Sequence, residues 1–314
     1  MDASFKHPVL AVVGPTASGK TALSLALAER FNGEIISSDS MQIYRGLDIG
    51  TAKATAEERA RVPHHGIDIC DSEQPFSVAD FTQYAAAKEQ ELFSRGKLPV
   101  LCGGTGLYVQ SFLDGVRFAA EKTDPALRAA LAAELESRGK EAMYEELQRV
   151  DPKAAAAIHP NNTVRVLRAL EHYRATGHTL SMQNADSIPA EKPYRSLVIC
   201  LHFADRQKLY DRIDHRVELM MEQGVLREAE LVYKNRDRYR TAAQAIGYKE
   251  FFPYFEKAAA LEQCVADLKQ ASRNYAKRQL TWFRRMEGVL WLDAGNQDVI
   301  DCASQAVAAF LSEK

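Results

Sequence analysis

The sequence predicts an α/β fold, a parallel sheet flanked by helices, with an inserted all-helical domain and further helices towards the C-terminus. Three observations predict this class. Short apolar, β-branched runs alternate with amphipathic helix patterns, which is typical of a parallel sheet covered on both faces. A stretch rich in Ala, Glu, Leu and Arg shows no strand pattern. A glycine-rich loop joins the first predicted strand to the first predicted helix.

Five apolar runs are the predicted strands. They are Val9–Val13, Glu34–Ser37, Leu98–Cys102, Leu197–Phe203 and Val289–Leu292. Two of the gaps between them carry helix patterns, because apolar residues recur at helical spacing along Thr21–Phe31 and Val78–Phe93.

The helical insertion is expected between the third and fourth predicted strands. It begins with the helix-start signal Thr123-Asp124-Pro125. After the fourth strand, Asp205–Gly224 places apolar residues on one helix face and ends at a glycine, and a second long helix follows at Leu261–Arg285. We therefore expect a catalytic core of residues 1–115 and 196–314, with residues 116–195 as the insertion domain.

The composition excludes several classes of protein. The 314 residues include 40 Lys and Arg and 42 Asp and Glu, for a formal net charge of −2, and 46% are hydrophobic. These values are ordinary for a globular chain and exclude a disordered or collagen-like one. The five cysteines are scattered, which argues against a structural zinc site and fits a reducing compartment. No apolar run reaches membrane-spanning length, so we expect a cytoplasmic protein, most simply a monomer, without a membrane partner.

The strongest motif is a phosphate-binding loop (P-loop). Gly14-Pro15-Thr16-Ala17-Ser18-Gly19-Lys20-Thr21 fits G-x-x-x-x-G-K-[ST] and lies between a predicted strand and a predicted helix. Backbone N–H groups of such a loop point at a phosphate, and the helix N-terminus adds positive potential. Lys20 is expected to hold a phosphoryl oxygen, and Thr21 to offer its hydroxyl to Mg²⁺.

Two polar residues follow predicted strands at the same sheet edge as the P-loop. The strand-end acid of many P-loop enzymes is absent, because Leu98–Cys102 runs into Gly103-Gly104-Thr105-Gly106. Asp39 instead follows the second strand, and Thr105 follows the third, where ligands of open α/β sheets bind. Asp39 could alternatively be a turn or cap residue. The glycines around Thr105 could form only a tight turn, because glycine adopts backbone angles that other residues cannot.

Arg212 and Arg216 lie four residues apart on one face of the Asp205–Gly224 helix. They could neutralise a leaving diphosphate. The residues alone favour the simpler alternative, a solvated face or one that is salt-bridged with Asp211, Asp214 or Glu218.

A basic segment between Val265 and Met286 could bind nucleic acid. Its positive residues are Lys269, Arg273, Lys277, Arg278, Arg284 and Arg285. The first three recur every fourth residue and form one stripe on a helix. Tyr275, Trp282 and Phe283 are interleaved, so that phosphates and bases could both be bound. The alternative is a solvated helix whose aromatic side chains lie in the core.

Several motifs together resemble the tRNA dimethylallyltransferases of bacterial type, also called tRNA isopentenyltransferases. The resemblance extends from the first strand to about Leu292. It is carried by Gly14–Thr21, Ser38–Tyr44, Leu47–Lys53, Pro63–His65, Gly103–Tyr108, His159–Asn162, Arg165, Arg168–Glu171, Ile246–Lys249 and Ala276–Trp282.

This resemblance implies a reaction. A dimethylallyl group passes from its diphosphate to N6 of the adenine just 3′ of the anticodon (position 37), in tRNAs that read codons beginning with U. Asp39 would contact N6 as general base. Thr105 would donate to the oxygen that bridges diphosphate and allylic carbon, and Arg212 would assist at the same diphosphate. Thr16 to Thr21 of the P-loop would hold the diphosphate with Mg²⁺.

The resemblance also implies a set of contacts to the tRNA anticodon stem-loop. The adenine would be flipped out of its stack to reach the catalytic groups. Asn162 and Val164 depart from residues common in the family. The implied contacts are Asp39, Ser40, Met41, Gln42, Thr105, Arg128, Arg165, Arg168, Gln244, Gly247, Tyr248, Lys249, Arg273, Lys277, Arg278, Gln279, Trp282 and Arg284.

Two other functions compete with this one. The first is a P-loop small-molecule kinase or adenylate-type isopentenyltransferase, against which the basic segment and the helical insertion argue. The second is a nucleotide-regulated RNA-binding protein without chemistry, against which Asp39 and Thr105 at the sheet edge argue. Displacement of bound pyrophosphate by dimethylallyl diphosphate rather than by ATP would favour the transferase.

Overall fold

Six strands form one parallel sheet in the order β3-β2-β4-β1-β5-β6. The computed structural model describes residues 6–118 and 124–313. The strands are β1 (Pro8–Val13), β2 (Gly33–Ser37), β3 (His64–His65), β4 (Leu98–Gly103), β5 (Arg195–His202) and β6 (Val289–Asp293). The predicted fold class is confirmed, and so are the five predicted strands.

Strand β3 was not predicted from the sequence. Its two residues pair with Ile35 and Ile36 of β2. A strand this short contains no apolar run or alternation, so periodicity gives no signal for it. The pairing with β2 makes β3 an edge strand of the sheet.

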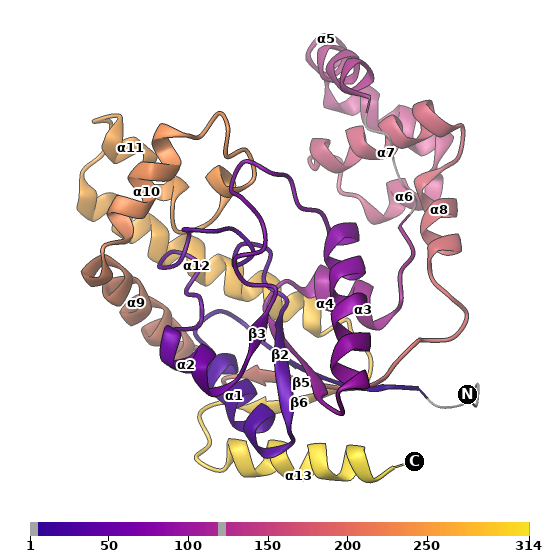
Figure 1. Cartoon of the computed structure of the whole chain (residues 1–314). Coiled ribbons are helices and arrows are strands. Elements are labelled where there is room, and N and C mark those ends of the chain that lie inside the picture. The colour runs from indigo at the N-terminus through magenta and orange to yellow at the C-terminus, as the bar shows by residue number, and fades with distance from the viewer. Residues whose placement is uncertain (1–5, 119–123, 314) are drawn as a thin grey trace. The chain divides into compact units, whose positions relative to one another are not determined.

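Different helices cover the two faces of the sheet (Figure 1). Helices α1 (Lys20–Arg30) and α13 (Val299–Ser312) bury apolar side chains against one face. Helices α3 (Val78–Ser94) and α4 (Gly106–Leu113) do so against the other. The short helix α2 (Ala56–Arg61) begins with a capping box formed by Thr55 and Glu58.

A third group of helices packs together beyond the sheet faces. It comprises α9 (Arg206–Gln223), α10 (Val225–Lys234), the 3₁₀ turns Ala242–Gln244 and Lys249–Phe251, α11 (Phe252–Phe255) and α12 (Leu261–Phe283). The predicted start of α9 at Asp205 and its end at Gly224 are confirmed by the N-cap and C-cap there. None of the described helices has the length and apolar character that a bilayer crossing requires.

Helix α12 takes part in three separate hydrophobic clusters. Cys264 and Leu268 pack with α9 and α10, Ala276 packs with two α9 residues, and Phe283 is fully buried against the α3 and α4 face of the sheet. One continuous helix therefore ties the third group of helices to the sheet.

Residues 115–191 form a second compact unit, distinct from the unit of residues 1–114 and 192–314. Its described part contains helices and no strand, namely α5 (Pro125–Val150), α6 (Pro152–Ala157), α7 (Thr163–Thr176) and α8 (Leu180–Ser187). Helix α5 starts at Pro125 after the Asp124 N-cap, and its backbone is non-helical at Gly139. Leu131, Met143 and Leu170 are among the buried residues of its core. Thr123 of the predicted start signal lies outside the described residues.

A buried carboxylate joins β2 to its neighbours. Glu34 accepts hydrogen bonds from Arg95 at 2.9 and 3.0 Å, and its Oε2 lies 2.7 Å from His65 Nε2. Burial acts to raise the pKa of Glu34, but the hydrogen bonds from Arg95 and His65 outweigh burial and lower it. The folded state therefore favours the ionised carboxylate.

Glu34→Gln should lower the free energy of unfolding by about 1–3 kcal/mol at pH 7, because a buried charge-assisted network loses its anion. Since folding depresses the pKa of Glu34, its contribution is present above the unfolded value of ~4.3 and is lost as the pH falls further. Urea unfolding at several pH values checks this, with Glu222→Gln, an exposed residue outside this network, as control. A difference between wild type and Glu34→Gln that grows on acidification would contradict the assignment.

Candidate active site

The P-loop leads from β1 into α1, as its sequence predicts. Gly19 adopts φ +89° and caps the helix, which begins at Lys20. Ala17 also has a positive φ of 62°, and its carbonyl accepts a hydrogen bond from Arg212 Nε at 2.9 Å. A side chain at Gly14 would come within 2.8 Å of the Leu201 carbonyl oxygen of β5. The loop is therefore held against both the sheet and α9.

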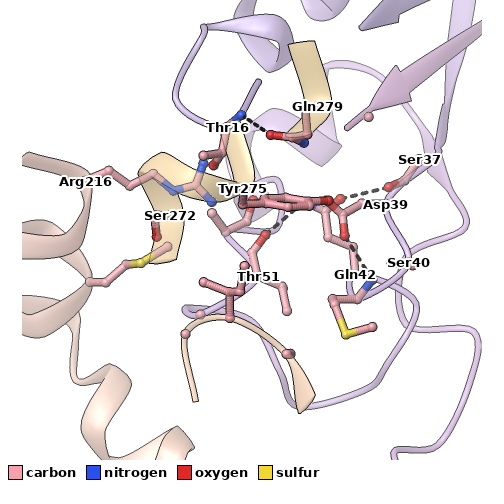
Figure 2. A pocket seen from close by; sticks show the side chains of 18 of the residues that line it. Thr16, Ser37, Asp39, Ser40, Gln42, Thr51, Arg216, Ser272, Tyr275 and Gln279 are labelled. Carbon is pink, nitrogen blue, oxygen red and sulfur yellow. Dashed lines mark hydrogen bonds between the residues drawn. The ribbon is translucent and has the colours of Figure 1, made fainter. Parts of the chain in front are cut away.

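A cavity of about 300 Å³ lies beside the P-loop (Figure 2). It is bounded by the carboxyl ends of β2 and β4 and by α9 and α12. Among the described residues that line it, Asp39 supplies the one carboxylate, and the cations are Lys20, Arg216, Lys249 and Arg278. This excess of positive charge suits an anionic ligand.

A second cavity of about 310 Å³ also borders the P-loop. Lys20, Thr21 and Arg216 line both cavities, whereas Arg212 and His215 line only the second. The P-loop lysine and threonine therefore stand where the two spaces meet.

Asp39 combines the two functions that the sequence left open. Its Oδ1 accepts a hydrogen bond from Met41 N at 2.9 Å, as a turn residue does, and the same side chain lines the first cavity. Thr105 lies next to it but faces Ser40. Thr105 Oγ1 accepts from Ser40 N at 3.1 Å and donates to Ser40 Oγ at 3.4 Å. Thr105 is not part of the described cavity lining.

The glycines around Thr105 serve close packing and not unusual backbone angles. Gly103, Gly104 and Gly106 do not have positive φ values, so the interpretation as a turn that needs glycine geometry is wrong. A Cβ would lie 2.4 Å from Ser38 Oγ at Gly103, 2.0 Å from Gln279 Nε2 at Gly104 and 2.4 Å from Trp282 at Gly106. Gly104 and Gly106 therefore let α12 approach the sheet edge, and Gly103 leaves room for Ser38.

Gln279 of α12 joins the P-loop to the loop after β4 (Figure 2). Its Oε1 accepts from Thr16 N at 2.8 Å, and its Nε2 donates to the Gly104 carbonyl at 3.0 Å. The side chain is 4% exposed, so both hydrogen bonds are shielded from water. Gln279 was expected to contact tRNA, and in this structure its amide is occupied within the protein.

Tyr275, one turn before Gln279, reaches into the cavity. Figure 2 shows its ring between the Arg216 guanidinium and the Asp39 carboxylate. Burial raises the pKa of this phenol, and the negative charge of Asp39 raises it further. Tyr275 is therefore a neutral aromatic wall and a hydrogen-bond donor.

Two half-buried cations of the cavity, Lys20 and Arg216, respond to these surroundings. Burial lowers the pKa of Lys20, whose Nζ donates to the Pro15 carbonyl at 3.3 Å. Burial also lowers the pKa of Arg216, and the charge of Asp39 acts in the opposite direction. A bound anion would stabilise the charged forms of both side chains.

Comparison with known proteins decides the family. The family model described as IPP transferase matches residues 42–286, and the model described as isopentenyl transferase matches residues 7–63. The chain belongs to the IPP transferase family. The predicted family and enzyme class, a transferase, are confirmed.

Relatives of known name match nearly the whole chain. The tRNA dimethylallyltransferase of Halalkalibacterium halodurans is 48% identical over 293 residues, 93% of each chain. That of Bacillus subtilis is 49% identical over 288 residues, covering 92% of this chain and 91% of the relative.

Solved structures agree with these relatives. The tRNA isopentenylpyrophosphate transferase of Bacillus halodurans matches with a TM-score of 0.74 at 46% identity, over 98% of both chains. A eukaryotic dimethylallyltransferase acting on tRNA matches with a TM-score of 0.83 at 31% identity, over 98% of this chain and 80% of that one.

The basic stripe of this IPP transferase differs from the expectation. Lys269 pairs with Glu218 at 2.8 Å, and Arg273 pairs with Asp214 at 2.6 Å, so two of its three cations bind α9. The salt-bridged interpretation of Arg212 and Arg216 is wrong for the described residues, because Asp214 and Glu218 pair with cations of α12 and Asp211 accepts a hydrogen bond from Gln207 Nε2 at 2.8 Å. Phe283 lies in the core, as the alternative for the aromatic residues predicted.

The other expected tRNA contacts fall into several groups. Asp39, Ser40, Met41, Gln42, Gln244, Gly247, Lys249, Arg278 and Gln279 line the first cavity. Lys277 and Arg284 are exposed on or just after α12, and Trp282 is half-buried, donating to Gln110 Oε1 at 3.1 Å. In the second unit, Arg165 and Arg168 are exposed on α7, and Arg128 pairs with Glu171 at 3.1 Å.

Tyr248 is unavailable to a ligand, although it was expected to contact tRNA. It is fully buried, and its hydroxyl donates to Glu228 Oε2 at 3.0 Å. The Glu228 carboxylate also accepts from the backbone amides of Asp48, Ile49 and Gly50. Glu228 thus holds the loop that forms one wall of the cavity.

Sequence reasoning missed Glu228, although one signal pointed towards such a residue. The segment Leu47–Lys53 carried family resemblance without any chemistry of its own. In the structure it is a loop fixed by buried polar groups, in which Lys53 Nζ donates to the Tyr44 carbonyl at 2.6 Å and to Asp48 Oδ1 at 2.6 Å. Two further residues, Ser37 and Gln42, are hydrogen-bonded to each other at 2.8 Å beside it.

Gly106→Ala should lower the free energy of unfolding by about 1–3 kcal/mol, because the added Cβ overlaps the Trp282 indole. When Gly106→Ala and Trp282→Ala are combined, the loss of unfolding free energy should be smaller than the sum of the two single losses. The reason is that Trp282→Ala removes the indole that the new Cβ overlaps. Urea denaturation of both single variants and the double variant measures this. If Gly106 did not face the Trp282 indole, alanine would stabilise α4 because its helix propensity exceeds that of glycine. A Gly106→Ala protein more stable than wild type would therefore contradict this packing.

Proposed function

We propose that this chain transfers a dimethylallyl group from dimethylallyl diphosphate to N6 of the adenine 3′ of the anticodon (position 37), in tRNAs that read codons beginning with U. The observation that carries the proposal is the placement of Asp39 in one cavity with Lys20 and Thr21 of the P-loop. Membership of the IPP transferase family supports the group transferred, and the names of the relatives support tRNA as the acceptor.

Asp39 acts as the general base in this proposal. The N6–carbon bond forms while the bond from the allylic carbon to the diphosphate oxygen breaks, and the N6 proton passes to the Asp39 carboxylate. An exocyclic amine is a weak nucleophile because its lone pair is delocalised into the ring. A carboxylate within hydrogen-bond reach therefore assists the step.

The P-loop and the arginines of α9 receive the leaving diphosphate. Its negative charge is met by Lys20, by the P-loop amides and by Arg216 and Arg212. Thr105 would donate to the bridging oxygen. Its contact with Ser40 Oγ is 3.4 Å long and can be exchanged for a charged acceptor.

The residues present fit a magnesium ion. Mg²⁺ keeps several waters and binds through few protein oxygens together with substrate phosphates. Thr21 offers a hydroxyl where both cavities meet, and no described cluster of three acids, histidines or cysteines favours a different kind of metal site. When bound, the ion would neutralise charge on the diphosphate.

The acceptor side of the cavity is lined by Met41, Gln42, Gln244, Gly247 and Lys249. An adenine must leave its stack to reach Asp39, and the Tyr275 ring provides a surface for a flipped base. Exposed cations of α12 and of α7 would bind the phosphates of the anticodon stem-loop. A tRNA substrate fits a cytoplasmic enzyme, which we propose acts as a monomer.

Asp39→Asn tests the role of this carboxylate while keeping its turn, because the amide oxygen can still accept from Met41 N. With Mg²⁺, labelled dimethylallyl diphosphate and an anticodon stem-loop bearing the target adenine, wild type should label the RNA. The variant should lose about 10²-fold or more in kcat, the size of general-base effects. RNA binding, measured separately, should change little.

The outcomes distinguish the parts of the proposal. If Asp39→Asn has the same kcat as wild type, the proposed reaction stands but Asp39 is not its general base. Asp237→Asn makes the same chemical change at an exposed residue that lines neither cavity, and this control should keep its rate within a few-fold. The proposed function would be wrong if wild type left the RNA unlabelled and transferred phosphate from ATP to a nucleotide. The protein would then be a kinase.

A further inference from the structure

His64 of β3 contributes a side chain to the first cavity that the reaction described above does not use. It pairs in register with Ile35 of β2, and both residues line the cavity with Thr21 and Cys102. Ile35 lies two residues before Ser37, the last residue of β2, whereas Asp39 follows the end of that strand. Along the strand direction, His64 thus lies farther from the carboxyl edge of the sheet than Asp39 does. His64 therefore lines the same cavity as the P-loop residue Thr21, from the edge strand of the sheet.

The hydrogen bonds of His64 define which ring nitrogen carries the proton. Nδ1 lies 2.8 Å from the Val62 carbonyl oxygen, which can only accept. Nδ1 is therefore the protonated nitrogen, and Nε2 presents a lone pair. Burial lowers the pKa of His64 and so favours this neutral form.

Nε2 has no hydrogen-bond partner in the described part of the chain, although it is buried. Leaving a buried acceptor unsatisfied costs about 1–3 kcal/mol, so such an atom requires an explanation. A ligand that satisfies it must supply an N–H or O–H donor. Of the groups that the proposed reaction brings into the cavity, the ionised diphosphate and the allylic chain have no such donor. The N6 amine of the adenine is directed at Asp39, whereas metal-bound water supplies two O–H donors.

The position that usually carries an acid in P-loop enzymes is apolar here. Cys102 lies at that strand end, beside Thr21 in the cavity lining, and Asp39 is the one carboxylate among the described lining residues. If Asp39 accepts the N6 proton, it is not available to the waters of a metal ion at Thr21. These waters then need another hydrogen-bond acceptor on the protein. The side chains of Ile35, Ser37 and Cys102 lie on the α1 side of the sheet, and His64 pairs with Ile35 there.

We propose that His64 Nε2 accepts a hydrogen bond from a water of the Mg²⁺ that the Thr21 hydroxyl and the bound diphosphate hold. His64 is thus a positioning residue that replaces the missing strand-end carboxylate. This inference rests on the proposed magnesium–diphosphate site. On this proposal the affinity for the metal depends on a neutral imidazole as hydrogen-bond acceptor. The metal-bound water also supplies the hydrogen bond that His64 Nε2 does not receive from the described residues.

Binding of Mn²⁺ as a paramagnetic probe in the presence of inorganic pyrophosphate tests the proposal without turnover. Free Mn²⁺ is measured by electron paramagnetic resonance during titration of each variant. His64→Phe keeps a ring but removes the acceptor, and it should weaken Mn²⁺ binding about 10-fold or more. His64→Gln places an amide oxygen near the Nε2 position and should retain binding within about 3-fold of wild type.

His65→Gln is the matched control on the neighbouring residue, because His65 binds Glu34 and does not line the cavity. Its Mn²⁺ affinity should equal that of wild type. Equal Mn²⁺ binding by wild type and a folded His64→Phe protein would overturn the role of His64. Absence of Mn²⁺ binding by wild type with pyrophosphate would instead overturn the metal site on which the inference rests.

Discussion

The amide of Gln279 is the interaction on which the rest of the site depends. It binds the P-loop at Thr16 N and the loop after β4 at the Gly104 carbonyl, from a helix that is distant in sequence. Both partners are backbone groups, and an unsatisfied buried amide would cost about 1–3 kcal/mol. The interaction therefore fixes the distance between the phosphate-binding loop and α12, and with it the cavity that Asp39 lines.

The same helix explains why glycines and acids occur where they do. Glycines at 104 and 106 leave room for Gln279 and Trp282, and Asp214 and Glu218 of α9 bind the cations on the neighbouring face of α12. Residues that look like nucleic-acid contacts in the sequence thus also hold the helix in place. The cations that remain exposed, Lys277 and Arg284 among them, are those left for an RNA backbone.

Local patterns predicted the sheet, the P-loop and the ends of α9, because strand runs, glycine spacing and caps are encoded in neighbouring residues. Asp39 could be identified from its place after a strand. Local patterns could not predict the roles of Glu228 and Gln279, nor the short strand that carries His64. Their functions arise from contacts between segments far apart in the chain, such as the 178 positions that separate Glu228 from Gly50. Sequence also could not show which cations of the α12 stripe pair with α9.

The central claim is that α12 holds the P-loop in its binding form through Gln279. Hydrogen–deuterium exchange of the P-loop amides in wild type and Gln279→Leu, together with calorimetric titration of pyrophosphate, tests it most directly. The account predicts faster exchange at the Thr16 amide and pyrophosphate affinity lower by about 10-fold, equivalent to ~1.4 kcal/mol. Unchanged exchange and unchanged affinity in a folded Gln279→Leu protein would contradict it.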